Sequence, residues 1–341
     1  MSRVLLTGGS GFIAAHTLDV LLEHGHSVVT TVRSQEKADK IKEAHPNVGK
    51  DKLDFAIVED IAQPDAFEKA VVSDPPFEIV LHTASPFHFN VTDVQKELLD
   101  PAVIGTTGIL KSIKKHAPTV KRVVITSSFA AILSPKTGFA KGVTYSEENW
   151  NDITTEEALQ NPQNGYRASK TFAERAAWDF VEKEKPNFQL STINPPLVFG
   201  PIVHYLNSLD GLNTSNQRVR DIIQGKSKAG IPATGVYIWV DVRDVALAHV
   251  KAFEAPNAGN KRFFVTEGGH FNNRLIVDII RKNFPEYESQ LPSPDVKGGE
   301  YPADGVFTAN NKQSIEVLGL KYRKFEDTIV DTVKSLQNVG A

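Results

Sequence analysis

The sequence predicts an α/β fold, in which a doubly wound parallel sheet of the Rossmann type carries a smaller C-terminal lobe. Through the first half of the chain, short β-branched runs alternate with stretches of helical periodicity, which is the pattern of such a sheet. The runs are continuously apolar, as parallel strands covered on both faces are. A glycine-rich segment separates the first run from the first helix, where this fold has a tight turn.

The first half of the chain contains the predicted strands of the main sheet. The helix after the first strand carries Ile13, Leu18 and Leu21 on one face and is closed by Gly25, a residue favoured at helix C-termini. A longer helix is expected over about 93–116 and another after Asn164. The strands are expected at 4–7, 27–32, 53–58, 78–82, 122–127 and 189–194.

Beyond Pro195 and Pro196 the rhythm of the sequence changes. Residues 200–235 and 286–310 are rich in loop-forming residues, apart from a helical piece near 217–223. Strands are expected at 236–240 and 261–265 and helices at 241–253 and about 326–337. We therefore predict a Rossmann domain over 1–195 and a lobe mainly over 196–341, with about 236–265 returning to the main domain.

Composition and charge exclude several classes of function. The chain has 341 residues, 40% of them hydrophobic, so it can bury a sizeable core. Its net charge of −3 predicts no basic surface for nucleic acid and no polybasic face for a membrane. The absence of cysteine excludes disulfides, thiol nucleophiles and cysteine-ligated metals. No signal peptide or apolar run of membrane length is recognised, so a cytoplasmic protein is expected.

The segment after the first strand predicts a dinucleotide site. Gly8 permits a tight turn, Gly11 lets a pyrophosphate approach the backbone, and Ala14 allows the helix to pack closely on the strand. The helix N-terminus adds N–H groups and the positive end of its dipole. An ordinary turn is the alternative, but the position between strand and helix favours the dinucleotide. The predicted cofactor contacts here are Thr7, Gly8, Ser10, Gly11, Phe12 and Ile13.

The end of the second strand indicates which dinucleotide is bound. Enzymes that use NAD usually place an acidic residue there, about 20 residues after the glycines. This chain has Arg33 instead, with Lys37 one helical turn later. Two cations at that edge suit a 2′-phosphate, so NADPH is the predicted cofactor. The alternative is that both are solvated residues that open a surface helix.

Two further features predict proton transfer to a carbonyl oxygen. Tyr166 and Lys170 lie four residues apart in a helical segment, and a neighbouring ammonium is expected to lower the pKa of the tyrosine. Ser127 and Ser128 follow the fifth strand at the edge where doubly wound sheets bind ligands. A hydroxyl there can donate to a substrate carbonyl and orient the tyrosine. Alternatively, Tyr166 and Lys170 are a surface pair that supports the helix, and the serine only caps the next turn.

Together with the stretches 32–37, 80–87, 126–131 and 237–244, these residues resemble the extended short-chain dehydrogenase/reductase family over nearly the whole chain. Within it, the chain is similar to the branch of dihydroflavonol reductases, cinnamoyl-CoA reductases and yeast methylglyoxal or carbonyl reductases. The resemblance implies that Ser128 is the catalytic serine and Tyr166 the acid. It also implies that Lys170 tunes the tyrosine and binds the ribose.

The resemblance further implies where cofactor and substrate contact the chain. Arg33 and Lys37 would hold the 2′-phosphate. Other cofactor contacts would be Asp60 and Ile61 at the adenine, Thr83, Ala84 and Ser85 along the channel, and Pro195 and Val198 at the nicotinamide. The substrate wall would be apolar and comprise Phe87, Phe129, Leu133 and Leu197, each with a place in the core as an equal alternative. No metal site is predicted, because His82 and His88 lack further ligands at suitable spacing.

The sequence thus predicts an NADPH-dependent carbonyl reductase that transfers a hydride to aldehydes or ketones. The expected partner is a small-molecule carbonyl compound, without nucleic acid or membrane, and the expected state is a monomer or homodimer. The 1–195 domain would bind the cofactor and the C-terminal lobe the substrate. Two alternatives stay open: a nucleotide-sugar epimerase or dehydratase of the same fold, and a binding protein that senses NADPH without chemistry.

Overall fold

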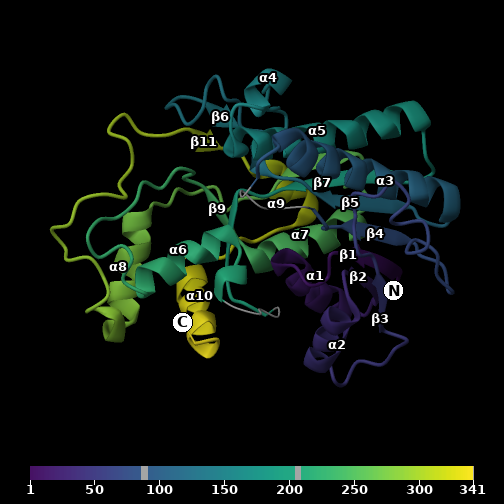
Figure 1. The fold of residues 1–341 in the computed structure, drawn as a ribbon, viewed down its shortest axis with the longest axis horizontal. Helices are drawn as coiled ribbons and strands as arrows, with labels where there is room; N and C mark the ends of the chain where they lie inside the picture. Colours follow the sequence, from purple (N-terminus) through teal and green to yellow (C-terminus); the bar gives the residue numbers. More distant parts are fainter. Residues whose placement is uncertain (86–90, 204–208, 341) are drawn as a thin grey trace.

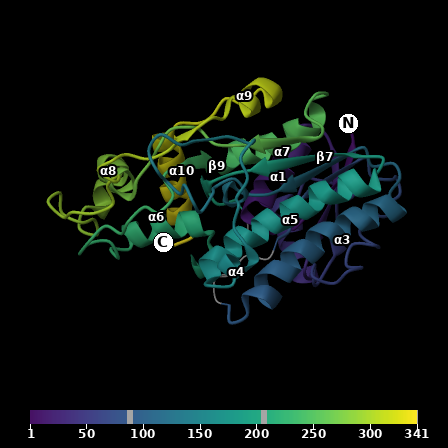
Figure 2. The same ribbon diagram turned by 90° about the horizontal axis from the view of Figure 1, so that it is seen from above.

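The computed structural model describes residues 1–85, 91–203 and 209–340 and shows a parallel sheet with helices on both faces (Figures 1 and 2). In the described part of the chain this sheet has seven strands in the order β10-β7-β5-β4-β1-β2-β3. Every pairing between neighbours in it is parallel, which confirms the predicted Rossmann-type fold. The strands are β1 (Arg3–Thr7), β2 (Ser27–Val32), β3 (Leu53–Ile57), β4 (Ile79–His82), β5 (Arg122–Thr126), β7 (Gln189–Asn194) and β10 (Lys261–Phe264).

Successive residues of each strand face opposite layers of helices, which explains the continuous apolar runs. In β1, Val4 and Leu6 pack in one core cluster, whereas Leu5 packs in the other. Figure 2 shows α1 and α7 on one side of the sheet and α3 and α5 on the other. The first layer contains α1 (Phe12–Glu23), α2 (Gln35–Ala44) and α7 (Val242–Glu254), and the second contains α3 (Asp100–His116) and α5 (Pro162–Glu184).

A second lobe packs around the buried rings of Phe199, Trp239 and Phe271. Its helices are α6 (Thr214–Ile223), α8 (Asn273–Asn283) and α10 (Phe325–Asn338). Of the strand predicted at 236–240, only the end becomes β9 (Trp239–Asp241), and it pairs with β8 (Leu197–Phe199) outside the main sheet. Other short elements include α4 (Thr155–Ala158), α9 (Lys312–Leu318), β6 (Thr144–Tyr145) and β11 (Thr308–Ala309). Across the described ranges, no helix has the length and apolarity to cross a membrane.

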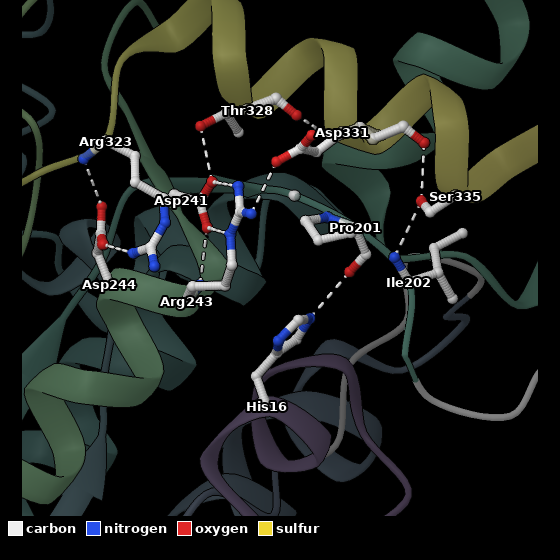
Figure 3. A network of polar contacts seen from close by, with 12 residues as sticks. His16, Pro201, Ile202, Asp241, Arg243, Asp244, Arg323, Thr328, Asp331 and Ser335 are labelled. Atoms are coloured by element: carbon white, nitrogen blue, oxygen red, sulfur yellow. Dashed lines mark hydrogen bonds and ion pairs between the residues drawn. The ribbon is translucent and has the colours of Figure 1, made fainter. Parts of the chain in front are cut away.

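A buried ion-pair network fastens α10 to the start of α7 (Figure 3). Asp241 is fully buried and accepts from Arg243 Nε at 2.9 Å and from its Nη2 at 2.6 Å. Arg243 Nη1 continues to Asp331 of α10 at 2.7 Å. Two more hydrogen bonds hold the segment after β8, one between His16 Nε2 and the Pro201 carbonyl (2.8 Å) and one from the Ile202 N–H to Ser335 Oγ (3.0 Å). The segment between the lobes is therefore fixed to both α1 and α10.

Candidate active site

The glycine loop lies between β1 and α1 at the carboxyl edge of the sheet. Gly8 has a φ of +76°, and a Cβ at this position would lie 3.0 Å from the Ala84 Cα, so the loop approaches β4 as only glycine permits. The N-terminus of α1 has no side-chain cap and no acidic residue in its first turn. It presents its backbone dipole to an anion, and the loop fits the pyrophosphate of a dinucleotide.

Thr7 ties this loop to the end of β4. Its hydroxyl bonds His82 Nδ1 at 2.9 Å and accepts the Ala84 N–H at 3.1 Å, and Thr83 Oγ1 donates to its carbonyl at 2.5 Å. Burial, together with the charge of Lys170, lowers the pKa of His82 to about 3, so this imidazole is neutral. Thr7 is fully buried, and its hydrogen bonds position the loop, while the predicted cofactor contact stays a prediction.

The end of β2 and the first turn of α2 form a cationic corner beside the loop. Arg33 is exposed, and in the described ranges no carboxylate lies within 4 Å of the charged groups of Arg33 or Lys37. Lys37 and Ser10 both line a shallow cleft between α1 and α2. Hydrogen bonds from Gln63 and Ala62 and the charge of Arg33 lower the pKa of Asp60, which places these two charges near each other. The corner suits an adenosine that carries a phosphate.

The structure brings the predicted Ser, Tyr and Lys together. Ser128 accepts the Ala130 N–H at 3.1 Å, so it caps the turn after β5, and its side chain is also hydrogen-bonded to Tyr166. Lys170 Nζ donates to Ser85 Oγ at 2.7 Å and lies 5.8 Å from the centre of the Tyr166 ring. Ser128 therefore both caps the turn after β5 and lies beside Tyr166.

Burial governs the protonation of this pair. It raises the pKa of Tyr166, although the hydrogen bond with Ser128 acts in the opposite direction. It lowers the pKa of Lys170 to about 8. The net lowering of the tyrosine pKa expected from the sequence is not found here, because desolvation of the phenol outweighs the influences that lower it. Tyr166 is consequently a neutral proton donor at ordinary pH.

The predicted substrate wall divides into core and edge residues. Phe129 is 2% exposed and stacks on Phe264 and Phe307 with ring centres 5.2 and 5.6 Å away, and Leu133 packs in the same cluster. Both side chains are thus enclosed in the aromatic cluster, and their predicted contact with substrate stays a prediction. Leu197 is half-buried against the C-terminal lobe. Phe87 lies outside the described residues.

The residues predicted at the nicotinamide end follow β7. Pro195 is buried and its carbonyl accepts the Phe129 N–H at 2.9 Å, whereas Val198 is 8% exposed and pairs with Val240. Sequence reasoning missed Asn194, whose amide donates to the Ser128 carbonyl at 3.2 Å. The sequence signal that could have identified Asn194 is its position as a polar residue at the end of a strand, at the edge of the sheet where this fold binds ligands.

One group of described side chains, His24, His26 and Glu254, has ligand atoms within 4.8 Å of one another. The backbone N–H of Ser2 donates to His26 Nδ1 at 3.1 Å, so the proton of this imidazole sits on Nε2, which faces Glu254 at 3.2 Å. A metal-bound imidazole instead donates its second N–H to a neighbour. The polar atoms of this group are therefore paired with one another by hydrogen bonds. Lys251 Nζ lies 2.9 Å from the same Glu254 carboxylate.

Comparison with known proteins identifies the family to which the chain belongs. The NAD dependent epimerase/dehydratase family matches residues 4–272, and the chain belongs to this family of extended short-chain dehydrogenases/reductases. It is 48% identical over 335 residues to a ketoreductase of Aspergillus niger, across 98% of this chain and 97% of the other. It is 39% identical over 338 residues to the NADPH-dependent methylglyoxal reductase of Saccharomyces cerevisiae, across 98% and 97%. The structure of Gre2 from Candida albicans in complex with NADPH matches with a TM-score of 0.93 at 40% identity, over 100% of both chains.

Proposed function

We propose that this protein is an NADPH-dependent carbonyl reductase that converts aldehydes and ketones, methylglyoxal-like compounds and aliphatic and aryl ketones among them, into alcohols. The observation that carries the proposal is the meeting of Ser128, Tyr166 and Lys170 at the sheet edge beside the glycine loop. The relatives named as a ketoreductase and as NADPH-dependent methylglyoxal reductases support the same reaction and the same cofactor.

The side chains of the site have separate tasks in this reaction. When bound, NADPH supplies the hydride that reduces the carbonyl carbon. The glycine loop would hold its pyrophosphate, and Arg33 and Lys37 its 2′-phosphate. Tyr166 Oη donates its proton to the oxygen as negative charge develops there, while the Ser128 hydroxyl holds the same oxygen. The Lys170 ammonium stabilises the phenolate left on Tyr166.

We propose the remaining cofactor and substrate contacts from the places of these residues in the fold. Asp60 and Ile61 would flank the adenine, Thr83, Ala84 and Ser85 would line the channel, and Pro195 and Val198 would face the nicotinamide. Leu197 at the edge of the C-terminal lobe would contact substrate. We also propose that the enzyme acts in the cytoplasm on small carbonyl compounds, as a monomer or a homodimer.

Initial rates of NADPH oxidation with methylglyoxal, 3-methylbutanal and an aryl ketone test the proposal, with NADH in parallel. We expect turnover with NADPH and much weaker turnover with NADH. Tyr166→Phe removes the proton donor and should lower kcat by at least about a hundredfold while NADPH still binds. Tyr287→Phe, in the C-terminal lobe away from the site, is the matched control. NADPH binding without turnover on any carbonyl compound, or full turnover by Tyr166→Phe, would contradict the proposal.

A further inference from the structure

Helix α5 carries a fully buried residue in line with Tyr166 and Lys170, which are themselves half-buried. Glu174 follows Lys170 by four residues, so all three side chains lie along one face of the helix. The Glu174 side chain is 1% exposed, and no step of the proposed reaction uses it. Because a buried carboxylate is costly unless it is paired and hydrogen-bonded, its partners indicate what it does.

One carboxylate oxygen of Glu174 binds two residues that adjoin the catalytic serine, Ser128. Oε2 accepts from Ser127 Oγ at 2.5 Å and from Asn194 Nδ2 at 2.7 Å. Ser127 directly precedes Ser128 in the chain, and the same Asn194 amide donates to the Ser128 carbonyl at 3.2 Å. The ends of β5 and β7 are thereby held against the helix that carries Tyr166.

The other oxygen is held by a cation that is itself immobilised. Oε1 accepts from Arg262 Nε at 2.6 Å, and Arg262 Nη1 donates to the carbonyls of Glu147 and Asn149 at 2.6 and 2.7 Å. The guanidinium also lies 3.6 Å from the centre of the Trp150 ring. Since a buried ion pair adds little net stability over apolar packing, the benefit of this arrangement lies in the geometry that it fixes.

We propose that Glu174 is a positioning residue, which fixes Ser128 relative to Tyr166 by holding Ser127 and Asn194 against α5. This inference rests on the proposed function, because it concerns the same site. The glycine loop lies between β1 and α1, Arg33 between β2 and α2, and Lys37 in α2, and none of these segments makes the contacts of Glu174 described above. Loss of the carboxylate should therefore slow the chemical step and leave NADPH binding unchanged.

Glu174→Gln tests the proposal because it keeps the shape of the side chain but directs amide hydrogens at groups that are themselves donors. We expect kcat per bound NADPH to fall by about tenfold to a hundredfold, the loss that small misplacements of reacting groups cause. The KM for NADPH should not change. The deuterium isotope effect on kcat with C4-labelled NADPH should rise, because hydride transfer then limits turnover more fully. A merely structural role would lower the melting temperature and the amount of NADPH-binding protein without changing this isotope effect.

Glu182→Gln, an exposed position on the same helix, is the matched control and should behave as the wild type. Wild-type kcat and isotope effect in Glu174→Gln would overturn the inference. If Glu174→Gln does not fold, Ser127→Ala removes one donor and leaves the Arg262 ion pair, and it should give a smaller fall in kcat with a raised isotope effect. An unchanged kcat in Ser127→Ala overturns the inference in that case. A wild-type protein that reduces no carbonyl compound overturns the proposed function and this inference together, whereas unchanged variants of an active enzyme overturn the inference alone.

Discussion

Tyr166 and Lys170 depend on burial in opposite ways. Removal from water disfavours the charged form of each group, so the pKa of the phenol rises and that of the ammonium falls to about 8. The tyrosine keeps its proton throughout the ordinary pH range. The lysine loses its proton under mildly alkaline conditions, and with it the positive charge that stabilises the phenolate formed in the reaction.

This difference predicts an alkaline loss of activity. The active form carries a protonated Lys170, so kcat/KM for carbonyl reduction at saturating NADPH should be constant below a pH of about 8 and fall as the pH rises through that value. Rates measured from neutral to strongly alkaline pH test this. Lys170→Arg keeps the charge at all these pH values and should lose the alkaline fall, although at a lower rate. A wild-type profile that stays flat into the strongly alkaline range contradicts this role of the lysine.

At the scale of single residues, the sequence predicts which side chains lie together when they share one helix or one continuous loop. Tyr166 and Lys170 share a helix, and the glycine loop is continuous in the chain, so both could be predicted. The packing of Phe129 in the aromatic core could not be predicted, because sequence does not show which way a turn directs its side chains. Arg262, the partner of Glu174, was not predicted because it comes from β10, far away in the sequence.

At the scale of elements, the parallel strands were predictable because each is an apolar run buried on both faces. The pairing of β6 with β11 was not, because two-residue strands from distant segments leave no periodic signal. β8 and β9 have the same difficulty, since only three residues of each pair. Helix α8 was not predicted either, although Ile276, Ile279 and Ile280 recur in it at helical spacing.

The end of β2 and the first turn of α2 together predict cofactor preference. Replacing both Arg33 and Lys37 by Ala removes two charge-assisted contacts, each worth about 1.5–3 kcal/mol, or roughly tenfold or more in kcat/KM for NADPH. The value for NADH should change little, so the preference for NADPH should collapse. Steady-state kinetics with both cofactors measures this. Lys42→Ala, exposed at the far end of α2, is the control, and an undiminished NADPH preference in the double variant would rule out the 2′-phosphate assignment.

At the scale of the whole molecule, the Asp241–Arg243–Asp331 network holds the C-terminal lobe to the sheet domain (Figure 3). Arg243→Leu leaves Asp241 buried without its cation, and we expect a loss of about 3–5 kcal/mol in the free energy of unfolding. Lys282→Leu breaks an exposed ion pair between α8 and α10 and should cost less than about 1 kcal/mol. Denaturant titration compares the two variants, and equal losses would show that the network does not fasten the lobe.

In the proposed reaction, hydride passes directly from NADPH to the carbonyl carbon of the substrate. A cofactor labelled with deuterium traces that transfer. The measurement supplies NADPH carrying deuterium on one or the other face of nicotinamide C4, and mass spectrometry then reads the product alcohol. We expect one of the two labelled forms to give an alcohol with a single deuterium on its carbinol carbon. Alcohol free of deuterium from both forms, or cofactor oxidation without any alcohol, would contradict carbonyl reduction by this protein.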